Sequence, residues 1–260
     1  MTFDMNRVFS KLIQRGGVVA HIRESVLIVG TYFVYLFLRR TVGSNAEDSA
    51  WANAEWIINL EKKLGFFWEP FWHQWAVQTS EWIIIAFNWI YIVTFFPIVL
   101  ITALVYYLFD RERYFYYRSI ILLSFGISLI IFCLFPLTPP RMMGEYNFVN
   151  TFVIYGPSWY AGEDMVGYYN AFAAMPSLHF AWTMIFGVLF FKHGSLVFKC
   201  IGVLYPSLTL LAITITANHY ISDAIVGAVV MLVAYALYEK LVHYKIPMKI
   251  WHLISGGNAE

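Results

Sequence analysis

The segment Asn218-His-Tyr-Ile-Ser-Asp223 places a histidine and an aspartate four residues apart. On one helical turn, side chains at this spacing can contact each other. A carboxylate that hydrogen-bonds one imidazole nitrogen fixes the tautomer and leaves the other nitrogen nucleophilic. The same spacing arises often by chance, so His219 and Asp223 need further residues around them to indicate a function.

A second histidine follows a proline in the segment Ala174-Met-Pro-Ser-Leu-His179. His179 could protonate the oxygen of a leaving group. Pro176 suits the first turn of a helix, and we expect the free backbone N–H groups of Ser177 and Leu178 to form an anion site there. Taken alone, the segment could equally be an ordinary helix start.

An arginine ends a third segment, Pro136-Leu-Thr-Pro-Pro-Arg141. Its planar, permanently charged side chain can hydrogen-bond two phosphate oxygens at once. An isolated arginine near the end of a membrane span commonly anchors that span at the interface. In combination, the three segments predict phosphate chemistry at His219, Asp223, His179 and Arg141. Tyr220 and Asn218, which flank His219, are weaker candidates for contacts to a headgroup.

The elements that position these residues belong to a membrane protein. Hydrophobic residues make up 60% of the chain, charged residues 13%, and the mean hydropathy is +0.63, against about 45–50% and about 25% in soluble domains. The chain is too apolar for a soluble protein of this size, so the bilayer is its expected solvent. The net charge of +1 gives no electrostatic support for a nucleic-acid partner.

Apolar segments divide the chain into about six expected transmembrane helices of an all-α fold. The first and fourth are short for a span of about 20 residues, and the second is long enough to be tilted or broken. The segments are 25–38, 83–109, 119–135, 178–191, 197–216 and 224–238. We interpret the chain as one membrane domain, 1–260, with an N-terminal part (1–80), a core (81–240) and a cytoplasmic tail (241–260).

Basic residues predict the orientation, because they favour the cytoplasmic side. With the N-terminus inside, five of the 17 Lys and Arg residues lie outside, and twelve lie inside: Arg7, Lys11, Arg15, Arg23, Arg111, Arg113, Arg118, Lys192, Lys199, Lys240, Lys245 and Lys249. Both termini are therefore expected in the cytoplasm of a cell-membrane protein. This topology places the three candidate segments at one surface, the extracytoplasmic one.

Two long outer segments accompany the candidate residues. Residues 39–80 show helical spacing of apolar residues and hold half of the ten tryptophans, which predicts amphipathic helices lying in the interface. Residues 136–177 form a long connection of the kind that is often functional. Within it, Glu145, Glu163 and Asp164 could hold the hydroxyls of a polyol, or could be part of a solvated loop.

At these residues the sequence resembles the type-2 phosphatidic acid phosphatase (PAP2) superfamily, over roughly residues 80–240. Pro176-Ser-Leu-His179 is similar to the family's second motif, and His219-x3-Asp223 to the end of its third. The resemblance implies a six-helix bundle without a metal or other cofactor. It also implies a phosphohistidine mechanism with His219 as nucleophile, Asp223 as its partner and His179 as general acid, which then activates water or an alcohol.

The chain departs from the family pattern at several cationic positions. Leu134 stands where the first motif has lysine, Met142 follows Arg141 in place of proline, and Ala212-Ile213 replaces a Ser-Arg pair. With its Pro-Pro-Arg and His-Tyr-x-x-Asp segments, the sequence is similar to the branch of inositol phosphorylceramide synthases and related bacterial proteins. That branch includes transferases.

The leading hypothesis is therefore a phosphatase that hydrolyses a phosphomonoester or pyrophosphate of a membrane lipid or polyprenyl carrier. The close alternative is a phosphotransferase that passes a phosphoryl group or phospho-headgroup to an alcohol. Two other classes are a metalloprotein with His179, His219 and Asp223 as ligands, and a transporter. The sequence shows no paired half-helix pattern that would indicate a transporter. The expected partners are a lipid-linked phosphate and the surrounding membrane lipids.

Overall fold

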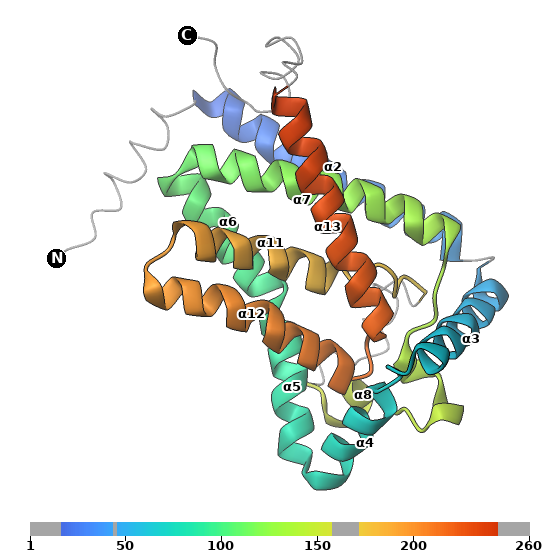
Figure 1. The fold of residues 1–260 in the computed structure, drawn as a ribbon. Helices are drawn as coiled ribbons and strands as arrows, with labels where there is room; N and C mark the ends of the chain where they lie inside the picture. Colours follow the sequence, from blue (N-terminus) through green and yellow to red (C-terminus); the bar gives the residue numbers. More distant parts are fainter. Residues whose placement is uncertain (1–16, 44–45, 158–171, 244–260) are drawn as a thin grey trace.

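The computed structural model describes residues 17–43, 46–157 and 172–243, and the regular secondary structure of this part is helical apart from one isolated bridge between Leu137 and Ala173. Figure 1 shows long helices crossing one another, with short helices gathered at one end. In chain order the α-helices are α2 (Gly17–Gly43), α3 (Glu47–Leu64), α4 (Glu69–Thr79), α5 (Glu81–Thr94), α6 (Phe96–Phe109), α7 (Arg111–Leu134), α8 (Thr151–Tyr155), α11 (Leu178–His193), α12 (Leu196–Ile215) and α13 (Ile221–His243). The all-α expectation is confirmed.

All six predicted apolar segments lie in helices. Within the described residues, five stretches are long and apolar enough to cross a membrane: Gly17–Phe37, Glu81–Phe109, Arg111–Leu134, Leu196–Ile215 and Ile221–Leu241. The fourth segment, 178–191, forms α11, which has only 16 residues and is shorter than a full span of about 20. The fold is that of a polytopic membrane protein.

The second predicted segment is broken in the middle, as its length suggested. Helix α5 ends at Thr94, Phe95 leaves the helical conformation with φ −95° and ψ −96°, and α6 begins with Pro97 in its first turn. A proline in a helix interior removes one backbone hydrogen bond and clashes with the preceding turn. The chain therefore restarts as a new helix at this point, and Phe95 lies in the break.

The centre of the bundle depends on a close helix pair. Helices α11 and α12 lie side by side (Figure 1), and a Cβ atom added to Gly187 of α11 would lie 2.6 Å from the carbonyl oxygen of Gly202 in α12. Close approach at small residues is the usual way in which membrane helices pack, because apolar side chains gain little by leaving lipid. This contact fixes α11, which carries His179, against α12, which leads to His219.

Helices α3 and α4 are amphipathic and cover the end of the bundle where α12 stops and α13 starts (Figure 1). In α3 the residues Ala54, Ile57 and Ile58 are buried against Leu137, Met143, Met175 and Tyr220. Their other faces expose large side chains, among them Trp56, Trp68, Phe71, Trp72 and Trp75. This arrangement confirms two amphipathic helices. Their position at a membrane interface remains a prediction.

Polar contacts gather at the opposite end of the bundle. Arg118 of α7 forms a salt bridge of 3.0 Å with Glu24 of α2, and Tyr114 donates a 2.7 Å hydrogen bond to the same carboxylate. Tyr116 of α7 donates to Glu239 near the end of α13. These residues lie far along the helices from the candidate site, so the basic side chains and the candidate site occupy different ends of the molecule.

Candidate active site

Backbone hydrogen bonds bring the three predicted segments together. The amide of Leu137 donates to the carbonyl of Phe172 at 2.7 Å, and the amide of Ala174 donates to the carbonyl of Leu137 at 3.3 Å. The amide of Arg141 donates to the carbonyl of Ala217 at 2.7 Å. The segments that lead to Arg141, His179 and His219 are therefore joined directly by main-chain contacts at one end of the bundle.

The ring of His219 is held by two acceptors on one nitrogen. Its Nδ1 lies 2.9 Å from the carbonyl oxygen of Ala174 and 3.2 Å from Oδ2 of Asp223. A carbonyl oxygen can only accept, so Nδ1 carries the proton and Nε2 keeps its lone pair. Nε2 has no hydrogen-bond partner in the part of the chain that the structure describes. The arrangement leaves one imidazole nitrogen available as a nucleophile.

Asp223 reaches His219 across a turn, not along a helix. Helix α13 begins only at Ile221, and Asp223 lies in its first turn. Its Oδ2 atom also accepts a 2.9 Å hydrogen bond from the backbone N–H of Tyr220. The predicted contact is present, but its geometry is that of a carboxylate folded back over the start of its own helix, where the helix dipole favours a negative charge.

His179 is the second residue of α11, and its ring centroid lies 5.9 Å from that of His219. Its imidazole stacks on the ring of Tyr91 at 4.1 Å and on the ring of Phe95 at 3.9 Å. The two aromatic residues come from the end of α5 and from the break after it. They hold the plane of the His179 imidazole.

Tyr91 and Phe95 are site residues that the sequence analysis missed. Both belong to a long apolar segment in which aromatic residues are frequent, and His179 follows 84 or more residues later. Their only signal is a spacing of four residues, which places two rings on one helix face. That signal gains meaning only when the structure shows what lies between the rings.

Arg141 is partly buried and is oriented by a sequence neighbour of His219. Its Nη1 atom donates a 2.9 Å hydrogen bond to Oδ1 of Asn218, and Nδ2 of Asn218 donates in turn to Oγ1 of Thr216 at 2.6 Å. The charge of Arg141 acts on His179, so the guanidinium is close to the two histidines. Asn218 was predicted as a weak headgroup contact, whereas in the structure it holds Arg141.

The expected anion site at the start of α11 is only partly available. Ser177 is fully buried as the N-cap of α11, and its backbone N–H donates to the carbonyl of Asp223 at 3.0 Å. The expectation of a free N–H at Ser177 is therefore wrong, because this group ties α11 to α13. Pro176 lies before the cap and not in the first turn. A phosphate contact of the Leu178 N–H stays a prediction.

The remaining predicted contacts lie apart from the two histidines. Tyr220 is fully buried in the cluster under α3, so its side chain points away from a headgroup position. Glu145 is exposed beside Glu55, and a hydrogen bond between these two carboxyl groups raises the pKa of Glu145. Glu163 and Asp164 lie outside the described residues.

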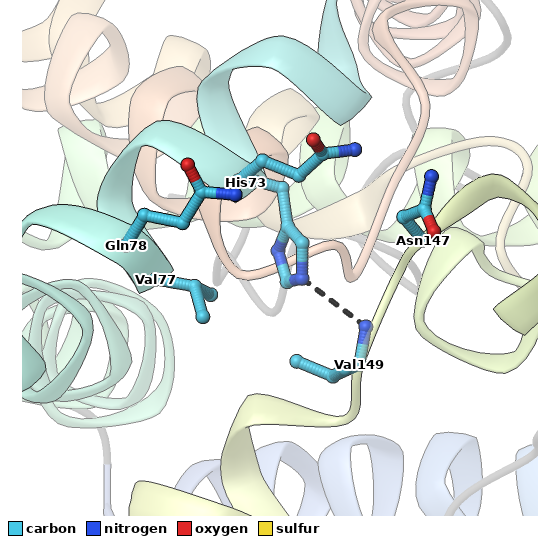
Figure 2. Close-up of a pocket in the computed structure, with 6 residues that line it drawn as sticks. His73, Val77, Gln78, Asn147 and Val149 are labelled. Carbon is cyan, nitrogen blue, oxygen red and sulfur yellow. Dashed lines mark hydrogen bonds between the residues drawn. The ribbon is translucent and has the colours of Figure 1, made fainter.

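A hollow beside His73 adjoins the loop that contains Asn147 and Val149, as Figure 2 shows. It is lined by His73, Gln74, Val77, Gln78, Asn147 and Val149. Nε2 of His73 accepts from the backbone N–H of Val149 at 3.1 Å, and Nδ1 donates to the carbonyl of Ile215 at 2.8 Å. Burial lowers the pKa of His73, so this neutral ring is a structural link between α4, α12 and the loop.

Metal ligation finds no support in the arrangement of the predicted ligands. Across residues 17–43, 46–157 and 172–243, no three side chains of His, Cys, Asp or Glu are grouped so that they could hold a metal ion. His179, His219 and Asp223 therefore do not form the two-histidine, one-carboxylate set that was weighed from the sequence. In the structure Nδ1 of His219 is directed at Asp223 itself.

The fold and the site define an all-α polytopic membrane protein with paired histidines at one end of the bundle. The profile of the PAP2 superfamily matches residues 55–237. The chain belongs to this superfamily, and its membership supports phosphatase-type chemistry on lipid phosphates in general. No curated protein and no solved structure matches the chain. The resemblance to the inositol phosphorylceramide synthase branch stays a prediction.

Proposed function

We propose that the protein is a lipid phosphate phosphatase that works through a phosphohistidine at His219. The observation that carries the proposal is the double restraint on Nδ1 of His219, by Ala174 and Asp223, with His179 next to it. A fixed tautomer with an available Nε2 is what a histidine nucleophile requires. The substrate class is a phosphomonoester or pyrophosphate on a membrane lipid or polyprenyl carrier.

The proposed reaction has two steps. In the first, Nε2 of His219 forms a bond to phosphorus, the bond from phosphorus to the lipid oxygen breaks, and protonated His179 gives its proton to that oxygen. In the second, His179 takes a proton from water, the water oxygen attacks phosphorus, and the bond to Nε2 breaks. Arg141 balances the charge of the phosphoryl oxygens in both steps.

A phosphotransferase is the second candidate, and the outer surface supplies the observation that favours it. Tyr146 donates a 2.8 Å hydrogen bond to Glu55, and Glu145 lies beside them. Exposed carboxyl groups of this kind could bind the hydroxyls of a polyol acceptor. An acceptor must be aligned with phosphorus and water kept out. Hydrolysis needs no such pocket, and we therefore favour hydrolysis.

Purified protein given dioctanoyl phosphatidate in detergent tests the proposal. We expect release of inorganic phosphate without an added alcohol, and no release by a His219→Ala variant. Phosphate release at background, together with phosphorylation of added inositol or diacylglycerol, would establish the transferase instead. A wild-type protein inactive in both assays would contradict the proposed chemistry.

The proposed topology places the site on the extracytoplasmic side of the cell membrane, with both termini in the cytoplasm. It is supported by the bias of the basic residues. Arg111 and Arg118 contact His21 and Glu24 of α2, and Lys192 donates a hydrogen bond to Tyr235 of α13. These contacts lie at the end of the bundle away from His219.

A further inference from the structure

Two glutamates that the mechanism does not use are buried next to the nucleophile. Glu61 comes from α3 and Glu69 from α4, and both side chains are fully buried. Oε1 of Glu69 accepts from the backbone N–H of Ile221 at 2.6 Å, and Oε1 of Glu61 accepts from the backbone N–H of Ser222 at 2.8 Å. These two N–H groups are the first of α13. The glutamates therefore cap α13 from two other helices.

This type of cap is unusual because neither glutamate is near α13 in the sequence. The first N–H groups of a helix have no partner within it and are normally satisfied by a side chain just before the helix. In α13 that position is taken by Tyr220, whose side chain is apolar apart from its hydroxyl. The start of α13 therefore depends on α3 and α4 for its hydrogen bonds and for a negative charge at its positive end.

The second oxygens of the two glutamates show that the pair holds a proton. Oε2 of Glu61 and Oε2 of Glu69 are both buried, and neither has a hydrogen-bond partner among the described residues. Two ionised carboxylates buried at adjacent N–H groups of one helix would repel each other strongly, so the pair holds one proton. Burial, followed by the charge of Glu61, raises the pKa of Glu69 to about 9.

Other titratable groups around the pair add negative charge. Besides burial, the negative charge of Asp223 raises the pKa of Glu61. Burial also raises the pKa of Tyr220, followed by the negative charges of Asp223, Glu61 and Glu69, with a smaller effect of Glu55 in α3. His73 lies one turn along α4 from Glu69, and its buried ring has a lowered pKa and is neutral. If the pair lost its proton, it would carry a second negative charge that faces Asp223 without a new counter-ion. Like charges in a buried site repel strongly.

We propose that Glu61 and Glu69 are a proton-sharing pair that positions both histidines by fixing the start of α13. His219 and Asp223 belong directly to this start. In the same turn, the carbonyl of Asp223 accepts a hydrogen bond from the backbone N–H of Ser177. Ser177 lies one residue before α11 and two residues before His179. A shift of the first turn of α13 therefore displaces the nucleophile and the acid together. The catalytic part of this inference rests on the proposed function.

Replacement of Glu69 by glutamine and by leucine tests the pair. In Glu69→Gln the amide oxygen still accepts from Ile221, and the amide N–H donates permanently to Glu61. Glu69→Leu removes both interactions. Glu47→Gln, an exposed change on α3, is the matched control. The probe is dioctanoyl phosphatidate, with kcat and KM measured from pH 6 to pH 10.

The expected results differ between kcat and KM. In the wild type and Glu47→Gln, kcat falls as pH rises through about 9, because the shared proton is lost. In Glu69→Gln this alkaline limb disappears while kcat at pH 7 is kept. In Glu69→Leu, kcat at pH 7 falls on the order of 10²-fold, the effect expected of a displacement of about 1 Å, while KM changes little.

Two measurements do not depend on turnover. Infrared spectra should show the carbonyl stretch of a protonated carboxyl group in the wild type at pH 7, and this band should be missing in Glu69→Gln. The stability should follow the raised pKa of Glu69: between about pH 4.5 and about 9 the folded state holds a proton that the unfolded state has released. Over this window the Tm of the wild type should therefore fall relative to that of Glu69→Gln.

The outcomes separate this inference from the proposed function. An infrared band that is absent in the wild type, or unchanged in Glu69→Gln, would overturn the shared proton. A folded Glu69→Leu variant with normal kcat, or an alkaline limb that persists in Glu69→Gln, would overturn the positioning role. A wild type that releases no phosphate but shows the expected band and Tm profile would overturn the proposed function and support the shared proton.

Discussion

Replacing Asp223 by asparagine removes the charge that faces His219 but keeps the atoms that hold its ring. The side-chain oxygen of asparagine can occupy the place of Oδ2 and accept from both Tyr220 and His219. The amide nitrogen then occupies the place of Oδ1, which has no hydrogen-bond partner within the described part of the chain. Independently, the carbonyl of Ala174 keeps its 2.9 Å contact with Nδ1 of His219. The nucleophile therefore stays in the correct tautomer.

The expected cost is that of exchanging a charged hydrogen bond for a neutral one. Charged hydrogen bonds contribute about 1.5–3 kcal/mol and neutral ones about 0.5–1.5 kcal/mol, so the difference is about 1–2 kcal/mol. At about 1.4 kcal/mol for each tenfold change, kcat should fall about 5- to 30-fold. This is far less than the ~10⁴-fold loss known for the corresponding change in a serine protease triad, where the tautomer itself is lost.

Phosphate release from dioctanoyl phosphatidate by wild type, Asp223→Asn and Asp223→Ala measures the effect. The alanine variant is the contrast, because it leaves the buried N–H of Tyr220 without its acceptor. It should lower both Tm and kcat, whereas the asparagine variant should keep Tm. A folded asparagine variant that loses ~10⁴-fold in kcat would refute the argument, since Ala174 would then not hold the tautomer of His219.

Three further predictions concern the acid, its support and the topology. His179→Ala should lose most activity on dioctanoyl phosphatidate but much less on p-nitrophenyl phosphate, whose leaving group needs no proton; equal losses would remove His179 as the general acid. Phe95→Leu, which removes one of the rings stacked on His179, should lower kcat on dioctanoyl phosphatidate while leaving Tm and the p-nitrophenyl phosphate rate nearly unchanged, and equal effects on both substrates would contradict it. A cysteine at Asn150 should react with an impermeant thiol reagent added outside cells, whereas a cysteine at Glu112 should not; the reverse pattern would overturn the proposed orientation.

The parts of the fold that follow from local sequence were predictable. Apolar stretches and their lengths indicated the helices and showed that the second was long enough to be tilted or broken, since helix length in a bilayer is set by its thickness. The amphipathic character of α3 and α4 was visible in the spacing of their apolar residues. The contact of His219 with Asp223 was also predictable, because a separation of four residues brings side chains together in a turn as well as in a helix.

The parts that depend on distant contacts were not predictable from one sequence. Nothing in the sequence pairs Glu61 or Glu69 with another segment, and only the folded chain shows that they lie against the start of α13, more than 150 residues away. The second acceptor of His219 is a backbone carbonyl, which carries no sequence signal. The same limit explains Ser177: its N–H was expected to be free, but its partner is the carbonyl of Asp223, 46 residues further along the chain.

The central claim is that His219 becomes phosphorylated during turnover. His179→Ala, which should slow the attack of water, is mixed with p-nitrophenyl phosphate, quenched in alkali and digested, and the phosphorylated residue is located by mass spectrometry. The account predicts a phosphoryl group on the imidazole of His219, and none when His219 is also replaced by alanine. Phosphate found on another residue, or product formed at full rate by a His219→Ala variant, would contradict it.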